Sequence, residues 1–175
     1  MIRGLDGINP KIDPTAFVSE LAYIIGDVEI GEGSSIWPGA IIRSDMGKIS
    51  LGKNTCVQDN SIIHGDAPVV IGDGVVIGHK VLCHAKVVGN HVLIGNGATV
   101  NDGVVIGDDS LVASGAVVLE NMVIPSGSLV VGMPARVKGQ LNEKHRQLIQ
   151  FTSDHYVKNA IRYKSQGRLE SQMGD

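Results

Sequence analysis

The chain has 175 residues, a formal net charge of −3 and a hydrophobic content of 43%, of which very little is aromatic. It is long enough for one domain with a substantial core, and its mild negative charge without a basic stripe argues against nucleic-acid binding. Two cysteines are too few for a disulfide framework, and no apolar run approaches ~18 residues, so we expect a cytoplasmic protein that neither spans nor binds a membrane.

An aliphatic residue recurs every six positions along most of the chain. The period runs from Ile12 to Ile42 and, after three irregular steps, without a break from Val88 to Val130. Glycine often follows the aliphatic residue directly, and a small residue commonly stands four positions after it. A period of six fits neither a helix nor simple strand alternation, but it fits short strands joined by tight turns around a narrow interior.

Three such strands complete one coil of about eighteen residues, and coils stack at roughly 4.8 Å like neighbouring strands. The repeat therefore predicts an all-β fold, a parallel β-helix shaped as a triangular prism, over residues 1–139. The number of repeats corresponds to roughly six to seven coils.

The composition changes after Val130. Residues 131–140 contain Pro134 and Gly139 and are expected to leave the prism. Residues 140–166 are expected to form an α-helix packed on the prism, starting near Asn142 and Glu143, and a kink near Ser153–Asp154 is one alternative to a continuous helix. Residues 167–175 are expected to be a disordered tail. The predicted apolar stripe of the helix contains Leu141, Leu148, Phe151 or Thr152, His155, Tyr156 and Tyr163.

Counting repeats in threes assigns three of the histidines to faces of the prism. Ile63 and Cys83 are three repeats apart and lie on one face in adjacent coils. His64 and His84 follow them directly, so we predict that these side chains stack and point outward. His79 is predicted to lie on the neighbouring face.

The same count places Arg43 on the face of His64, and Gln58 and Asp59 on the face of His79, one coil below it. A three-fold rotation of parallel prisms would bring these two surfaces together. We therefore predict a homotrimer in which His64 and His84 meet His79 of the next subunit, and Arg43 pairs with Asp59 across the interface.

Three imidazoles around an open position suit catalytic zinc, which lowers the pKa of bound water towards neutrality. The simpler interpretation is three polar residues on a β-helix surface. The remaining histidines, His91, His145 and His155, are not expected to be ligands. Cys83 occupies an inward aliphatic position and is expected to be a small buried thiol.

Three segments carry a family resemblance: WPGAIIRSD, VQDNSIIH and IGHKVLCH. They resemble the γ-class carbonic anhydrases, especially the short bacterial and archaeal members, and the likeness covers nearly the whole chain. The resemblance implies a left-handed β-helix, and a Zn2+ ion, or Co2+ or Fe2+, held by His64 and His84 of one subunit and His79 of its neighbour.

The resemblance also implies a lyase reaction, in which metal-bound hydroxide attacks CO2 and bicarbonate is released. Gln58 would position the hydroxide or the CO2, and Arg43 would contact bicarbonate and pair with Asp59. Asp45 would support Arg43, and Tyr156 would approach the site from the terminal helix.

Several residues depart from the archaeal prototype of this family. The acidic loop that carries its proton shuttle is reduced here to GDAPVV, which leaves only Asp66. Met46 and Cys56 replace a glutamate and an asparagine, and Ser44 replaces a glycine. Proton transfer is therefore expected to be slow and the hydratase activity weak or absent.

Two other functions remain open. One is a hexapeptide-repeat acyltransferase or acyl-CoA-processing relative, in which one histidine would be a general base. Its weakness is that no long excursion leaves the prism to cover a coenzyme A arm. The other is a non-catalytic metal-binding trimer, which the missing glutamates favour.

Overall fold

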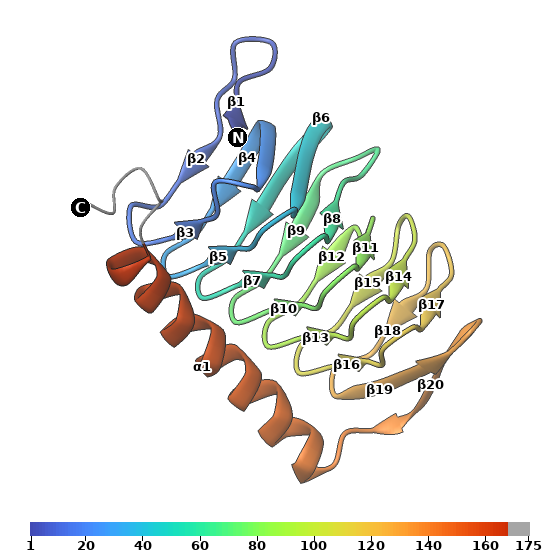
Figure 1. The fold of residues 1–175 in the computed structure, drawn as a ribbon. Coiled ribbons are helices and arrows are strands. Elements are labelled where there is room, and N and C mark those ends of the chain that lie inside the picture. Colours follow the sequence, from blue (N-terminus) through green and yellow to red (C-terminus); the bar gives the residue numbers. More distant parts are fainter. Residues whose placement is uncertain (168–175) are drawn as a thin grey trace.

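The computed structural model describes residues 1–167, which form a parallel β-helix of about seven turns followed by a helix, α1 (Glu143–Gln166; Figure 1). The predicted fold is confirmed. The part of the expected tail from residue 168 onward lies outside the described residues. Within residues 1–167, no helix is both long and apolar enough to cross a bilayer.

The strands stack into three faces. The first face contains the start of β6 (Ile41–Leu51), β8 (Ile62–Ile63), β11 (Leu82–Cys83), β14 (Thr99–Val100) and β17 (Val117–Val118). The second contains the end of β6, β9 (Val69–Ile71), β12 (Val87–Val88), β15 (Val105–Ile106) and β18 (Val123–Ile124). The third contains β3 (Phe17–Val18), β5 (Ser35–Ile36), β7 (Cys56–Val57), β10 (Val76–Ile77), β13 (Leu93–Ile94), β16 (Leu111–Val112), β19 (Ser128–Gly132) and β20 (Ala135–Gln140).

Two long strands join the first face to the second. β6 pairs with β8 through its first residues and with β9 through its last, so it bends around a corner of the prism. β4 (Tyr23–Ile30) lies beside it and bends in the same way, and β1 (Ile2–Arg3) and β2 (Lys11–Ile12) pair with its two halves. The irregular nine-residue step in the repeat is therefore one continuous strand with a bend.

The aliphatic residue of each repeat points into the prism, where burial of its side chain supplies the main driving force for folding. Hydroxyl groups satisfy the polar backbone at the corners. Ser61 Oγ donates to the Gly78 carbonyl at 2.5 Å and accepts from the Val81 N–H at 3.0 Å. Where the small residue of the sequence repeat is Ser or Thr, its hydroxyl therefore supplies a hydrogen-bond partner to the corner backbone.

The tight corners leave no room for side chains at some positions. Gly39 has a φ of +72°, and a Cβ atom there would lie 2.3 Å from Asn60 Oδ1 in the next coil. Glycine satisfies both the backbone conformation and the close approach.

Residues 131–140 do not leave the prism, contrary to the expectation from Pro134 and Gly139. β19 ends at Gly132, and β20 folds back to pair with it in the antiparallel direction. Gly132, with a φ of +98°, and Pro134 form the turn, so the breakers end one strand and start the next.

α1 lies along the third face (Figure 1). Asn142 caps it, with the side chain of His145 completing a capping box, and the helix continues through Ser153–Asp154 without a break. The predicted stripe is wrong at Leu148 and His155, which are exposed. Of the alternatives Phe151 and Thr152, Phe151 is exposed and Thr152 is half-buried, and Tyr163 is largely exposed although its ring packs against Trp37. Leu141 lies before the first residue of the helix, so its position does not follow the helical spacing. The residues that pack on the prism include Ile149, Tyr156 and Ala160.

Candidate metal centre

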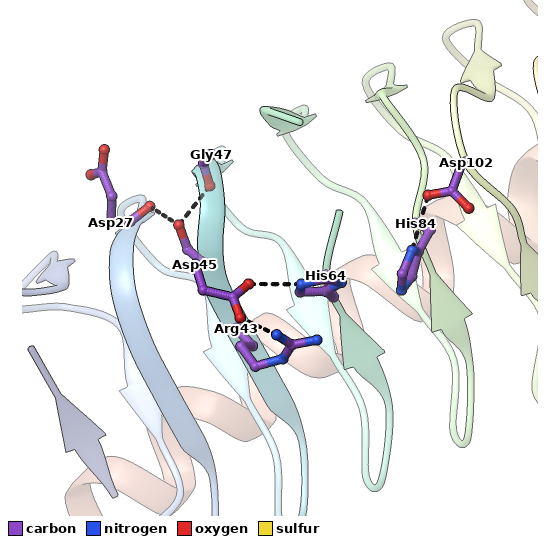
Figure 2. Close-up of polar contacts among 8 residues, drawn as sticks. Asp27, Arg43, Asp45, Gly47, His64, His84 and Asp102 are labelled. Atoms are coloured by element: carbon purple, nitrogen blue, oxygen red, sulfur yellow. Dashed lines mark hydrogen bonds and ion pairs between the residues drawn. The ribbon is translucent and has the colours of Figure 1, made fainter. Parts of the chain in front are cut away.

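The parallel register stacks His64 on His84. Ile63 pairs with Cys83, and the backbone N–H of His64 donates to the Cys83 carbonyl at 3.2 Å. The two imidazole centroids are 4.9 Å apart, and the rings are tilted by 60°. Figure 2 shows both side chains on the same side of adjacent coils. The repeat count therefore placed this pair correctly.

His64 is connected to Arg43 through Asp45 (Figure 2). His64 Nε2 donates to Asp45 Oδ1 at 2.8 Å, and Arg43 donates to the other carboxylate oxygen. The hydrogen bond from His64, together with the Arg43 charge, holds the pKa of Asp45 below its usual value. The expected pair of Arg43 and Asp45 is present in the structure, whereas the contact of Asp45 with His64 was not predicted.

Ser44 fixes the bend that presents Arg43 and Asp45. Its hydroxyl lies 3.0 Å from the Asp27 carbonyl and 2.6 Å from the Gly47 carbonyl. A glycine at this position would lack both contacts, so the serine adds side-chain contacts that the family's glycine could not make.

His84 is held from the coil above it. Its Nδ1 lies 3.1 Å from Asp102 Oδ1 (Figure 2). A histidine that donates Nδ1–H to a carboxylate has Nε2 as its basic nitrogen, which is the usual arrangement of a metal-binding imidazole. Sequence reasoning missed Asp102, because three repeats forward from His84 lead to Asn101, and Asp102 is the residue after it.

His79 lies at a different corner of the prism, after β10. Its Nδ1 is 3.1 Å from Asp59 Oδ2, one coil below, as the register of β7 and β10 requires. Gln58 is next to Asp59 and is only 4% exposed. The sequence therefore placed Gln58, Asp59 and His79 together correctly.

Tyr156 reaches this corner from α1. Its ring packs edge-on against Trp37 with centroids 5.5 Å apart. Burial raises the pKa of Tyr156, and the nearby Cys56 and Asp59 shift it in the same direction, so the phenol stays protonated at neutral pH.

The site residues thus form two separate surfaces. The His64–His84 surface consists of Arg43, Asp45, His64, His84 and Asp102, and the His79 surface consists of Gln58, Asp59, His79 and Tyr156. Within residues 1–167, no group of three or more His, Cys, Asp or Glu side chains is close enough to hold a metal ion. One chain therefore does not bring all three imidazoles together.

The donor chemistry fits a divalent metal. Each of the three imidazoles has one nitrogen at a carboxylate: His64 at Asp45, His79 at Asp59 and His84 at Asp102. The second nitrogen of His64, Nδ1, is buried and has no hydrogen-bond partner among the described residues. Nitrogen ligands oriented by carboxylates are typical of zinc sites and of related first-row metals.

The two cysteines are poor candidates for ligands. Cys83 lies inside the prism, where burial raises the pKa of its thiol to about 11. Cys56 packs against Trp37 and Val76, and burial raises its pKa to about 12. Both are thiols at neutral pH, whereas metals bind the thiolate.

Comparison with known proteins first defines the class. Residues 86–120 match the family model for bacterial transferase hexapeptide, six repeats. The crystal structure of a hexapeptide transferase family protein from Anaplasma phagocytophilum has a TM-score of 0.89 and 34% sequence identity, covering 93% of this chain and 97% of that one. Fold and repeat together define a hexapeptide-repeat β-helix protein.

Two relatives narrow the class to a family. A carbonic anhydrase from Geobacillus kaustophilus is 35% identical over 94% of this chain and 92% of its own length. γ-Carbonic anhydrase 1, a mitochondrial protein from Arabidopsis thaliana, is 42% identical over 84% of this chain, and the match spans 56% of the plant protein. The chain belongs to the γ-carbonic anhydrase family, as the sequence motifs predicted, and covers little more than half of its plant relative.

Proposed function

We propose that the protein is a γ-type carbonic anhydrase that interconverts CO2 and bicarbonate at metal sites shared between the subunits of a homotrimer. His64 and His84 of one subunit and His79 of the next would hold Zn2+, or Co2+ or Fe2+. The observation that carries this proposal is the stacked pair His64 and His84, with centroids 4.9 Å apart, on a surface separate from His79. Two half-sets of imidazoles on one chain require a second copy to complete the site.

A divalent ion bound by three imidazoles lowers the pKa of a water in its open position towards neutrality. The residues around it would bind and orient the reactants. Arg43 has a half-exposed guanidinium, which can donate two parallel hydrogen bonds to the planar bicarbonate ion. The Asp45 carboxylate accepts from this guanidinium with one oxygen and contacts His64 with the other, so it orients both groups.

The His79 surface would supply neutral hydrogen-bonding groups. The Gln58 amide can both donate and accept, which suits the orientation of a small substrate with oxygen atoms at both ends. Asp59 holds His79 in the single chain, and its predicted pairing with Arg43 of a neighbour would place both groups at the same site. Tyr156, protonated at neutral pH, can donate a hydrogen bond to a reacting oxygen.

The experiment is to purify the protein anaerobically, determine its mass in solution, count metal per trimer and follow CO2 hydration by stopped flow. His79→Ala should lose the metal and the activity. His91→Ala is the matched control, because His91 is also an outward histidine beside an aspartate. A metal-free trimer, or full metal in His79→Ala, would contradict the proposal.

With Asp66 as the one acidic residue of the shortened loop, we expect turnover to rise with buffer concentration, because proton transfer limits it.

An acyltransferase function is the second candidate, because the similar solved structure from Anaplasma phagocytophilum is named as a hexapeptide transferase family protein. In that case acetyl-coenzyme A would bind with a measurable affinity in calorimetry, and one histidine would act as general base. A metal-loaded trimer that neither hydrates CO2 nor binds acetyl-coenzyme A would instead be a non-catalytic metal-binding assembly.

A further inference from the structure

We propose that Asp102 is a positioning residue for His84: its carboxylate keeps the imidazole in the Nδ1–H tautomer, so that Nε2 is the nitrogen offered to the metal. The metal part of this inference rests on the function proposed above, whereas the tautomer can be tested in the metal-free protein. The contact itself is the 3.1 Å approach of His84 Nδ1 to Asp102 Oδ1.

The strand register brings Asp102 to this position. Val100 pairs with Cys83, so Asp102 lies one coil above Ala85, the residue that follows His84. Cys83 also pairs with Ile63, which puts Gly65 at the corresponding position one coil lower. Neither Ala85 nor Gly65 has a polar side chain, so in this column Asp102 supplies the carboxylate beside His84.

The backbone around Asp102 is held rigidly. Its carbonyl accepts from the Asn121 N–H at 2.8 Å, and the preceding Asn101 side chain donates to the Val118 carbonyl at 2.8 Å. The next residue, Gly103, has a φ of +70°, and a Cβ there would lie 2.3 Å from Asn121 Oδ1. A carboxylate on such a fixed turn can impose an orientation on its partner, as supporting residues of a preorganised site do.

His79 also has a carboxylate beside its Nδ1, on the other surface. Its Nδ1 also lies 3.1 Å from a carboxylate, that of Asp59. The Asp comes from the coil above in one case and from the coil below in the other. In both pairs Nδ1 faces a carboxylate, and of the two pairs that of His84 has the hydrogen bond.

A third pair of the same residue types provides a control. His91 Nδ1 and Asp109 Oδ1 are 3.6 Å apart, which is too long for a hydrogen bond, and His91 is 58% exposed. This pair lies near the start of α1 and belongs to neither surface. A substitution there changes the same kind of charge without touching the proposed site.

The first measurement is the tautomer of His84 by 15N NMR of histidine-labelled, metal-free protein. The wild type should show Nδ1 protonated and Nε2 bare. Asp102→Ala should convert His84 to a mixture of tautomers, and Asp102→Asn should retain the native form because its amide oxygen can still accept from Nδ1–H. Asp109→Ala should leave His84 unchanged. An unchanged His84 tautomer in Asp102→Ala would overturn the inference.

The second measurement is Zn2+ affinity by competition with a chromogenic chelator. Asp102→Ala should bind about 10- to 100-fold more weakly than the wild type, and Asp102→Asn should lose less. Asp109→Ala should match the wild type. An affinity of Asp102→Ala within about two-fold of the wild type would overturn the inference while leaving the proposed function intact. A wild type that binds no Zn2+ would instead contradict the proposed function, and the tautomer would then decide the inference alone.

Discussion

The His64–His84 surface and the His79 surface use the same imidazole–carboxylate contact on different supports. His64 and His84 follow strands β8 and β11 of a face that α1 does not cover, and the guanidinium beside them is half exposed. His79 lies at a corner next to the face covered by α1, beside a buried Gln58 and the packed ring of Tyr156. The first surface supplies two imidazoles and a positive charge, and the second supplies one imidazole and neutral donors. This difference is what the proposed function expects of two complementary halves of one shared site.

The largest expected effect is the loss of metal binding and activity when one histidine of either surface is substituted. His64→Ala and His79→Ala should each abolish metal binding and CO2 hydration. Mixed trimers made by unfolding and refolding the two variants together should recover about a quarter of the wild-type activity per chain. Random mixing gives both kinds of subunit in three trimers of four, and each of these has one intact site of three. The measurement is stopped-flow hydration after refolding, with each variant refolded alone as control. No recovery would mean that the two histidines do not act in one shared site.

A core substitution beneath either surface should lower the stability of the prism that supports both surfaces. Ile63 and Ile77 are fully buried inside the prism, below His64 and His79 respectively. Ile63→Ala and Ile77→Ala should each lower the free energy of unfolding by about 2–5 kcal/mol, because both remove apolar volume from a close-packed interior. Urea unfolding at one fixed protein concentration measures this loss. A loss below about 1 kcal/mol at only one position would show that this part of the prism relaxes around the cavity.

The alkylation rates of the two cysteines should distinguish the packing beneath the two surfaces. Cys83 is enclosed by the prism beneath the His64–His84 surface, whereas Cys56 is enclosed by Trp37 and Val76 beside α1. Their raised pKa values, about 11 and about 12, make both slow to alkylate at neutral pH. Tyr156→Ala should accelerate alkylation of Cys56 by about ten-fold and leave Cys83 unchanged, because only Cys56 depends on the packing of α1. Peptide mass spectrometry after timed iodoacetamide treatment distinguishes the two thiols. Equal acceleration at both would mean that the variant unfolds globally.

The smallest effect concerns the charge on the His64–His84 surface. The pKa of Asp45 is lowered from 3.8 by the His64 hydrogen bond and the Arg43 charge, so its contribution to stability is present above the ordinary pKa and is lost as the pH falls through the lowered value. The stability difference between the wild type and Asp45→Asn should therefore be constant near neutral pH and shrink below about pH 3.8. Asp59→Asn, on the His79 surface, serves as the comparison. A difference that persists unchanged to lower pH would show that Asp45 acts through packing and not through its charge.

Repeat arithmetic is sufficient to place most of the candidate site. Because each strand pairs with the strand three repeats away, a fixed count determines which side chains become neighbours. This count places His64 beside His84, and Asp59 beside His79, from the order of the residues alone. The same count leads from His84 to Asn101, so it does not predict the diagonal contact of His84 with Asp102, the next residue.

The bend of β6 and the orientation of α1 depend on tertiary contacts that the repeat count does not describe. Asp45 meets His64 because β6 bends at a corner, and the hydroxyl of Ser44 stabilises that bend. The phase of α1 could not be derived from its own sequence, because few of its residues are apolar and the packing of Trp37 against Tyr156 and Tyr163 decides which side faces the prism. Tertiary packing overrides weak helical periodicity in such cases.

The position of α1 also has a consequence for synthesis on the ribosome. Coils of a solenoid contact only their neighbours, so the first coils can form while later ones are still being made. The aromatic rings of Phe17 and Trp37, however, pack against Tyr156 and Tyr163, and Lys164 Nζ donates to the Ala16 carbonyl at 2.9 Å. The nascent chain must therefore carry an uncovered aromatic patch until residue 164 emerges, and the first coils to fold are the last to be sealed from water.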